Sequence, residues 1–433
     1  MTGAHSATVS ASVSASVSPS LSAGIIADDL TGAGDSAVQF AALGWQARLT
    51  LGDLFAVAVL PGSVVAVVTD SRAQHAEAAR LSTSSAVTAL MGSGIDRLFV
   101  KIDSTLRGSV PGQIRGALNA WTHRYPNAIA IVCPAYPAMG RTVEGGLLLV
   151  DGAGVETTSV GRDPVTPVAT SVLADLVPGS VGIRIGQADA EALAALITAA
   201  ASNVVTVDAS TDADLALLAA AIELLGARAV PVGSAGLAVQ MARVWGSGSA
   251  PTAATRSATA GRSVVVLSSL HDVSRAQYTH LLDSRIGVHT LAPTLEEILA
   301  ADGAMSSWIA ENFDAGTSAS VIVILSPARQ RDPLGDDSAN AVPVRVAAAL
   351  AAIADAVVST LGAGSLVLMG GEGARAVLDR FEAESVQVTH AIGEGTPIGV
   401  IEGGRLHGLT VVTKAGGFGS TSALTDFLPE LLE

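Results

Sequence analysis

We expect a two-domain α/β protein in which each domain is a mostly parallel sheet covered by helices. The length of 433 residues exceeds what one ordinary hydrophobic core supports and fits two domains of about 200 residues each. Hydrophobic residues make up 49% of the chain but aromatic residues only 3%, so Ala, Val, Leu and Gly carry the core. Short strand-like runs that are apolar throughout alternate with helix-like segments, which is typical of parallel strands buried on both faces.

The alternation of strands and helices can be followed along most of the chain. Strand-like runs are predicted at 24–28, 64–70, 97–103, 128–134, 181–185 and 204–208, and then at 263–269, 321–325 and 366–371. Helices are predicted near 32–44, 73–91, 112–121, 188–202, 212–226, 236–245 and 344–361. Residues 386–419 are Gly-rich and strand-like, and a short helix closes the chain.

Two segments without apolar periodicity set the expected domain boundaries. Residues 246–262 are small and polar and are interpreted as a linker between domains at 24–245 and 263–433. Residues 1–23 alternate Ser, Ala and Val without the basic start and apolar core of a signal peptide, so a disordered tail is predicted. No run of about 18 apolar residues without polar interruption occurs, so no membrane span is expected.

Charge and cysteine content disfavour some classes of partner. The net charge of −15 would repel nucleic acid and anionic membranes. Cys133 is the only cysteine, which excludes a disulfide framework and fits a reducing cytoplasm. Because this lone thiol lies in an apolar run, we interpret it as a packing residue and not as a nucleophile.

Lysine is nearly absent from the chain. Of the 24 basic residues only Lys101 and Lys414 are lysines, and each follows an apolar strand-like run instead of lying on a charged helix face. Since Arg has replaced Lys elsewhere, a compact ammonium group is predicted to be needed at both positions.

The first strand ends in a cluster of acids and a threonine: Asp28, Asp29, Thr31 and Asp35. Ligands bind at the carboxyl ends of strands in open α/β sheets. Paired carboxylates there can hold hydroxyl groups, bind Mg²⁺ or accept a proton. A helix N-cap alone would require only one of these side chains.

A competing interpretation of this segment is a nicotinamide-dependent dehydrogenase. Residues 32–37 match a G-x-G-x-x-A dinucleotide fingerprint, and Asp53 lies at about the right distance downstream. The fingerprint needs glycine directly after the strand, however, and here two carboxylates intervene that would repel a pyrophosphate.

A second polar cluster lies at the end of the run at 97–103 and contains Lys101, Asp103, Ser104 and Arg107. Two cations beside a carboxylate and hydroxyls suit a polyol that carries a carboxylate. An internal salt bridge between Lys101 and Asp103 is the structural alternative. Arg141, in a Pro-rich loop, is a further candidate anion ligand.

Three Ser- or Gly-rich turns follow strands in the C-terminal half. They contain Ser268-Ser269, Gly370-Gly371-Glu372-Gly373, and Lys414-Ala415-Gly416-Gly417. Glycines let backbone amides approach phosphates, so these turns predict a phosphate site. A Walker A sequence is absent, which excludes a P-loop enzyme. The eight His residues show no zinc spacing, and no metal ligands are identified from the sequence.

Together, the motifs resemble the four-carbon acid sugar kinase family. The segments that carry the resemblance are ADDLTGAGD (27–35), KIDSTLRG (101–108), CPAYPAMGRTV (133–143), DPVTPV (163–168), GGEGA (370–374) and TKAGGFG (413–419). The likeness covers nearly the whole chain after the tail. It implies an N-terminal acid-sugar-binding domain and a C-terminal nucleotide-binding domain, with the active site in the cleft between them. It also implies phosphorylation of threonate, erythronate or 3-oxo-tetronate at the terminal hydroxyl by ATP with Mg²⁺.

Carried over motif by motif, the resemblance assigns residues to two substrates. The sugar acid is expected to contact Asp28, Asp29, Lys101, Asp103, Ser104, Arg107 and Arg141, of which Asp29, Lys101 and Asp103 are the catalytic candidates. ATP is expected to contact Ser269, Gly370, Gly371, Glu372, Gly373, Lys414 and Gly416. Which aspartate accepts the proton is left open, and a homodimer is compatible with this interpretation.

The chain departs from the family pattern at two places on the nucleotide side. The family usually has a Gly-Ser-Cys-Ser turn where this chain has Ser268-Ser269-Leu270-His271, and it usually has Thr where this chain has Gly373. These departures leave room for an altered phosphate donor. A non-catalytic sensor that binds a sugar acid is the alternative to an enzyme.

Overall fold

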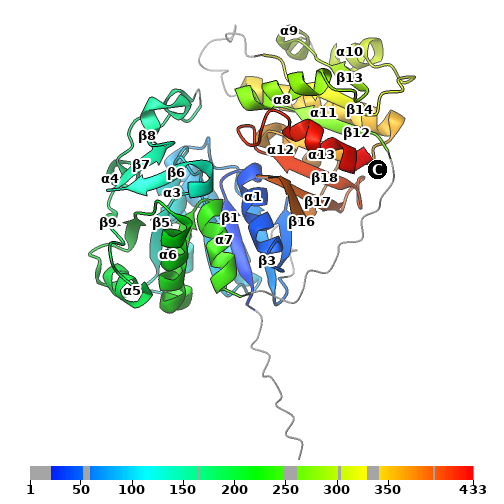
Figure 1. Ribbon diagram of the computed structural model, residues 1–433. Coiled ribbons are helices and arrows are strands. Elements are labelled where there is room, and N and C mark those ends of the chain that lie inside the picture. Colours follow the sequence, from blue (N-terminus) through cyan, green and yellow to red (C-terminus); the bar gives the residue numbers. More distant parts are fainter. Residues whose placement is uncertain are drawn as a thin grey trace, which may run out of the picture.

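The computed structural model describes residues 21–51, 59–163, 165–246, 261–300, 304–328, 341–393 and 395–432. It confirms a two-domain α/β architecture with mostly parallel strands flanked by helices (Figure 1). The predicted tail, apart from residues 21–23, and all but the ends of the predicted linker lie outside the described residues. Ser22 is ordered, because its backbone N–H and its hydroxyl both donate to Asp96 Oδ2 at 2.8 Å.

The N-terminal half is a sheet of eight parallel strands. Its strands, in sheet order, are β2 (Gln46–Thr50), β3 (Ser63–Val68), β1 (Ala23–Ala27), β4 (Arg97–Lys101), β11 (Ala229–Gly233), β5 (Ile129–Cys133), β10 (Val204–Val207) and β9 (Val181–Ile183). The helices are α1 (Leu30–Ala41), α2 (Ala76–Gly92), α3 (Val110–Trp121), α4 (Leu173–Leu176), α5 (Ala190–Ala199), α6 (Asp212–Leu225) and α7 (Ala235–Val244). A small antiparallel sheet joins β6 (Arg141–Glu144), β7 (Leu147–Val150) and β8 (Ala153–Gly154).

The C-terminal half is a mixed sheet. Its strands, in sheet order, are β13 (Val288–Leu291), β14 (Val321–Leu325), β12 (Ser263–Leu267), β15 (Ser365–Met369), β18 (Thr410–Lys414), β17 (Thr396–Glu402) and β16 (Ser385–Gly393). The first five are parallel to one another, β17 is antiparallel to β18, and β16 is antiparallel to β17. The helices are α8 (Asp272–Leu282), α9 (Leu295–Leu299), α10 (Ala304–Asn312), α11 (Ala341–Leu361), α12 (Gly371–Arg380) and α13 (Ala423–Leu432).

The two halves share one continuous sheet, which the sequence did not predict. Edge strand β2 of the N-terminal half pairs antiparallel with β16, so fifteen strands are hydrogen-bonded in succession. Beside this seam, Arg48 Nε lies 2.9 Å from Glu402 Oε2. Helix α1 also contacts α12 and strands β16, β17 and β18, so its N-terminus lies where the two halves meet.

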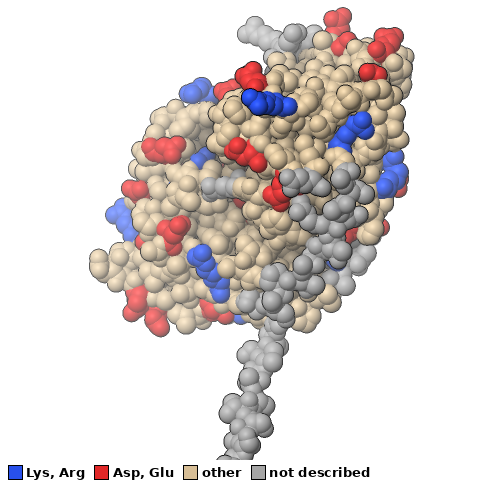
Figure 2. Space-filling view, turned by 45° about the vertical axis from the view of Figure 1, so that its right-hand side comes forward, with Lys and Arg blue, Asp and Glu red and all other residues tan. Residues whose placement is uncertain are grey.

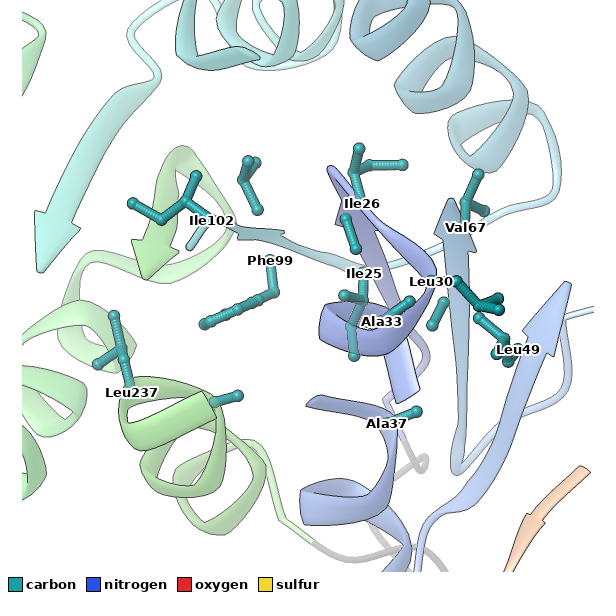
Figure 3. Packing of buried hydrophobic residues seen from close by; sticks show 14 of the residues in the cluster. Ile25, Ile26, Leu30, Ala33, Ala37, Leu49, Val67, Phe99, Ile102 and Leu237 are labelled. Atoms are coloured by element: carbon teal, nitrogen blue, oxygen red, sulfur yellow. The ribbon is translucent and has the colours of Figure 1, made fainter. Parts of the chain in front are cut away.

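The core follows from the apolar strands. All five residues of β1 are buried, because helices cover both faces of the sheet. Ile25, Phe99 and Leu237 lie on the face covered by α1 and α7 (Figure 3). Cys133 is fully buried at the end of β5, and burial raises the pKa of its thiol to about 12, which supports a packing role.

Helix α11 is long and apolar enough, by length and composition alone, to cross a membrane, although the sequence predicted no such segment. One side of the helix is buried at Leu350, Ile353, Ala354 and Val357, and it packs against α12 and strands β12 and β14. This arrangement is typical of a helix that covers a sheet. On the face shown in Figure 2, described acidic and basic side chains are scattered over a mostly uncharged surface.

Candidate active site

The acid cluster lies at the carboxyl end of β1, between β3 and β4. The chain leaves β1 toward β3 on one side and later adds β4 on the other, which makes β1 a topological switch point where α/β sheets bind ligands. Asp29 is the N-cap of α1, since its Oδ1 accepts from the Gly32 N–H at 2.8 Å and its Oδ2 accepts from the Thr31 hydroxyl at 2.7 Å.

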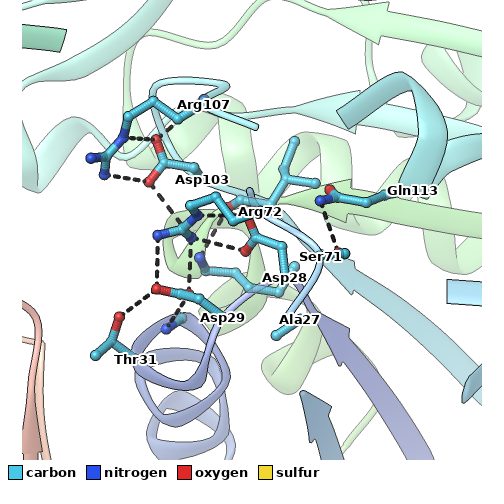
Figure 4. A network of polar contacts seen from close by, with 12 residues as sticks. Ala27, Asp28, Asp29, Thr31, Ser71, Arg72, Asp103, Arg107 and Gln113 are labelled. Carbon is cyan, nitrogen blue, oxygen red and sulfur yellow. Dashed lines mark hydrogen bonds and ion pairs between the residues drawn. The ribbon is translucent and has the colours of Figure 1, made fainter. Parts of the chain in front are cut away.

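Arg72, which sequence reasoning missed, binds both of these acids (Figure 4). Its Nε and one terminal nitrogen donate to the two oxygens of Asp28 at 2.8 and 2.9 Å. Its two terminal nitrogens donate to Asp29 at 2.7 and 2.9 Å. The guanidinium therefore holds the two carboxylates side by side. The available signal was its position just after β3, the same strand-end position that singled out the lysines.

Arg107 binds Asp103 through two nitrogens, as Arg72 binds Asp28, and we call each of these two-nitrogen pairs a fork. Its Nε and one terminal nitrogen donate to the Asp103 oxygens at 3.0 and 2.9 Å, and the other terminal nitrogen donates to Asp163 at 3.1 Å. Asp103 also lies 3.8 Å from an Arg72 nitrogen, which links the two forks. Asp103 is thus paired with arginines, and not with Lys101 as the structural alternative proposed.

Each fork is preceded by backbone in the left-handed region. Asp70 has φ of 49° two residues before Arg72, and Leu106 has φ of 57° directly before Arg107. Non-glycine residues adopt this conformation rarely, and it is held only where the surroundings enforce it. The chain therefore stores local strain at the two positions that aim the guanidinium groups.

Lys101 ends β4 and is 5% exposed. Its Nζ donates to the Ile102 carbonyl at 2.9 Å, and this is its only hydrogen bond to the described residues. A Cβ on Gly32 would lie 2.6 Å from Asp29 Oδ1 and 2.9 Å from Lys101 Nζ. Gly32 is thus required because α1 begins against both charged groups.

The three aspartates differ in their protonation. Burial raises the pKa of Asp28, whose side chain is 0% exposed, despite the opposing effect of Arg72. Burial would also raise the pKa of Asp29, but Arg72 and Lys101 lower it below the ordinary value. Arg107 and Arg72 outweigh burial and hold the pKa of Asp103 well below its ordinary value. Asp29 and Asp103 are therefore ionised at neutral pH.

The glycine turn after β15 faces this cluster from the C-terminal half. Gly370 has φ of 111°, which favours glycine, and α12 begins at Gly371. A Cβ on Gly371 would lie 3.7 Å from Asp29 Oδ2 and 3.8 Å from Thr31 Cγ2. The structure thus brings the first acid cluster and the GGEG turn together, although they are far apart in sequence.

Lys414 repeats the geometry of Lys101. It ends β18, it is 0% exposed, and its Nζ donates to the carbonyl of the next residue, Ala415, at 3.1 Å. Burial lowers the pKa of this ammonium to about 8. Both lysines of the chain therefore lie at strand ends with donors left over for a ligand.

The remaining candidates lie around these two centres. Ser104 is partly buried in the turn after β4. Arg141 begins β6, donates to the Met139 carbonyl, and has a buried Nε without a partner among the described residues. Glu372 is exposed in the first turn of α12. A Cβ on Gly416 would collide with the Ser269 hydroxyl, so these two turns are in close contact.

The dinucleotide fingerprint lies inside helix α1 and not in a loop. A Cβ on Gly34 would lie 3.1 Å from Pro397 and 3.3 Å from the Thr413 hydroxyl. This glycine is therefore explained by close packing of α1 against β17 and β18 rather than by a pyrophosphate. Asp53 lies outside the described residues.

The two departures from the family pattern touch each other. A Cβ on Gly373 would lie 2.4 Å from both Cβ and Oγ of Ser268. The Ser268 hydroxyl donates to the Met369 carbonyl at 3.1 Å and lies 3.3 Å from the Gly370 carbonyl. A side chain on one strand end thus fills the space that a side chain on α12 would need.

This contact predicts a coupled pair of substitutions. Gly373→Ala is expected to destabilise the protein by about 1–3 kcal/mol through overpacking, although Ala favours helix by about 1 kcal/mol. In a Ser268→Gly background the same substitution is expected to be neutral or stabilising. Urea unfolding of the four proteins in a double-mutant cycle measures the coupling. Equal effects of Gly373→Ala in both backgrounds would contradict it.

Comparisons with known proteins match two regions of the chain to two family descriptions. Residues 23–241 match the family described as a sugar-binding N-terminal domain, and residues 264–424 match the one described as a nucleotide-binding C-terminal domain. A D-threonate kinase of Bordetella bronchiseptica is 42% identical over 93% of this chain and 95% of that protein. A D-erythronate kinase of Heliobacterium modesticaldum is 29% identical over 94% and 96%, and a 3-oxo-tetronate kinase of Methylobacterium radiotolerans is 28% identical over 92% and 96%.

Solved structures share the fold. A Salmonella typhimurium protein superimposes with a TM-score of 0.75 at 20% identity, covering 94% of this chain and 99% of the other. A Haemophilus influenzae protein gives a TM-score of 0.66 at 21% identity, covering 95% and 100%. At these identities the likeness supports the architecture alone.

Proposed function

The chain belongs to the four-carbon acid sugar kinase family, and we propose that it phosphorylates the terminal hydroxyl of threonate, erythronate or 3-oxo-tetronate with ATP. The observation that carries this proposal is the approach of Gly371, at the N-terminus of α12, to Asp29 at the end of β1. A helix N-terminus with free amides suits a phosphate, and the carboxylate beside it suits a hydroxyl. The two groups that react in a kinase would meet at this point.

The N-terminal half supplies the sugar-acid side. Lys101 has two ammonium hydrogens left for the substrate carboxylate, and Arg107 with Arg141 adds positive charge around it. Asp103 and Ser104 would hold hydroxyl groups. Asp28 contacts the substrate least, since its side chain is 0% exposed behind Arg72, so we assign it to orienting that arginine.

Asp29 is the best-placed proton acceptor. Its side chain is 17% exposed, against 0% for Asp28, and it faces α12. In the transfer step the substrate hydroxyl oxygen attacks the terminal phosphorus of ATP, the bond from that phosphorus to the bridging oxygen breaks, and ADP leaves. The hydroxyl proton passes to Asp29. Such transfers depend mainly on positioning and charge neutralisation.

The C-terminal half supplies the phosphate side. Ser269, Gly370 and Gly416 surround the turn residues whose amides would contact phosphate, and Lys414 adds a cation. The described residues hold no group of three or more acids, histidines or cysteines that could bind a metal. Glu372, exposed in the first turn of α12, would contact a Mg²⁺ ion bound with ATP, and the ion would supply positive charge to the phosphates.

Lys414→Ala is expected to lower turnover at least about tenfold, which corresponds to about 1.4 kcal/mol of lost transition-state stabilisation, with the sugar-acid KM nearly unchanged. Because the pKa of Lys414 is about 8, its charged form declines as pH rises through that value. The wild-type kcat/KM for ATP should therefore fall above pH 8. Lys414→Arg should lose this alkaline limb but restore little turnover. Near-wild-type kinetics for Lys414→Ala would contradict the assignment.

The test of the function is ADP release from Mg-ATP in the presence of a panel of tetronates and 3-oxo-tetronates. Release with at least one acid, and phosphate at its terminal carbon, supports the kinase. Tight binding of an acid without ADP release would favour the sensor. A change in nicotinamide absorbance would favour the dehydrogenase, which neither the position of the fingerprint nor the relatives support. A cytoplasmic location and a homodimer remain predictions.

A further inference from the structure

His271 lies on the nucleotide side of the proposed site, where the family pattern has a serine. It is the N-cap of α8, and its Nδ1 accepts from the Val273 N–H at 3.2 Å. An Nδ1 that accepts cannot carry the ring proton, so the neutral ring carries it on Nε2. The helix cap thereby fixes which nitrogen of the ring is a donor.

The edge of the ring that carries Nε2 faces the glycine turn after β18. A Cβ on Gly417 would lie 3.1 Å from Nε2, and a Cβ on Gly416 would lie 3.3 Å from His271 Cβ. Among the described residues Nε2 has no hydrogen bond, and neither have the amides of Gly416 and Gly417. Three N–H donors that no described residue uses therefore lie close together, on His271 and on the glycine turn beside it. The Ser274 hydroxyl, which donates to the Gly416 carbonyl at 2.7 Å, ties this turn to α8.

The charges around the ring come from both halves of the protein. Burial lowers the pKa of His271, Asp272 opposes this, and the cations Arg107, Lys414 and Arg141 lower it further. The ring is therefore neutral at neutral pH. Arg107 and Arg141 belong to the proposed sugar-acid side and Lys414 to the proposed phosphate side, so charges from both sides act on the ring.

We propose that His271 is a phosphate ligand, whose Nε2–H donates to the terminal phosphate of the bound nucleotide beside the amides of Gly416 and Gly417. This inference rests on the proposed nucleotide site and adds a specific contact to it. A neutral donor fits this place because the charges of three cations already act on it. Hydrogen bonds to charged groups are the strong ones, so the loss of this bond should weaken ATP binding about ten- to hundredfold.

Two substitutions separate this role from helix capping. His271→Asn keeps an acceptor where Nδ1 caps the helix but removes the donor at Nε2. His271→Gln places an amide N–H near the position of Nε2 but removes the cap. The first should retain the melting temperature and bind ATP at least about tenfold more weakly, and the second should melt lower and bind ATP within about threefold of wild type.

The measurement is titration calorimetry of the full chain with Mg-ATP, Mg-ADP and AMP, without sugar acid, beside thermal unfolding. We expect the Asn variant to lose more affinity for ATP than for ADP, and none for AMP. Wild-type ATP affinity in the Asn variant, equal losses in both variants, or a loss confined to the Gln variant would overturn the proposal. A wild type that binds ATP but releases no ADP with any acid refutes the kinase and leaves this test intact. A wild type that binds no nucleotide refutes the nucleotide site itself.

Discussion

Arg72→Ala is expected to lower turnover at least about a hundred- to thousandfold and to destabilise the protein by about 3–5 kcal/mol. The substitution removes four hydrogen bonds to Asp28 and Asp29 and leaves two adjacent buried carboxylates without their shared cation. Arg72→Lys keeps the charge but cannot form the planar fork, so it should recover stability in part and turnover little. Turnover well below the melting temperature and urea unfolding measure both effects.

The pH dependence of stability identifies why Arg72→Ala destabilises the protein. In the wild type, Arg72 and Lys101 outweigh burial and lower the pKa of Asp29, so this acid stabilises the fold above its unfolded value of 3.8 and the contribution is lost at lower pH. Without Arg72 the folded-state pKa of Asp29 rises above the unfolded value, and that of Asp28, which burial already raises, rises further. Protonation then favours the folded variant, so the stability difference from wild type should narrow between pH 7 and 4.

Arg80→Ala is the matched control. Arg80 forms an equally good fork with Glu77, with Nε to Oε2 at 2.9 Å, but this pair is exposed on α2 and three residues apart. Exposed ion pairs contribute little to stability, so the melting temperature and turnover should not change. Similar losses in the two variants would show that Arg72 does not act through the buried acids.

The strands, and the polar residues placed at their ends, could be predicted because both depend on local sequence patterns. The residues of β1 and β5 are apolar throughout and buried throughout, and β12 is buried throughout with Ser263 as its one polar residue. The polar cluster that follows each strand then lies at the same edge of the sheet, since the strands are parallel. This argument placed Asp29, Asp103 and Lys414 at strand ends without any knowledge of their partners.

What could not be predicted depends on residues far apart in sequence. Strand β2 begins with Gln46 and contains Arg48. Its outer edge is hydrogen-bonded only because β16, more than 300 residues later in the chain, pairs with it. Arg72 follows a predicted strand, but its pairing with Asp28 and Asp29 is not evident until β3 is placed beside β1. In the same way, Ser268 and Gly373 look like two unrelated departures from the family pattern. Only the contact between the end of β12 and α12 shows that the Ser268 side chain fills the space beside Gly373.

Asp29→Asn is expected to lower turnover about a hundredfold or more while ATP affinity stays within about threefold of wild type. Asparagine keeps the shape and can still cap α1 by accepting from the Gly32 N–H, so the cap's contribution to stability should remain while the ion pair with Arg72 is lost. What is lost is the carboxylate that faces α12 and would take the hydroxyl proton. Steady-state kinetics, calorimetry with Mg-ATP and thermal unfolding measure the three quantities on one preparation.

Asp189→Asn provides the control, because Asp189 caps α5 in the same way, accepting from the Ala192 N–H at 2.9 Å, on a helix that packs against α6 and not against α12. It should retain full turnover. If Asp29→Asn keeps sugar-acid binding but loses ATP, the roles assigned to the two halves are reversed. If it keeps full turnover, the proton acceptor is Asp103, since its side chain is 10% exposed whereas Asp28 is enclosed by Arg72.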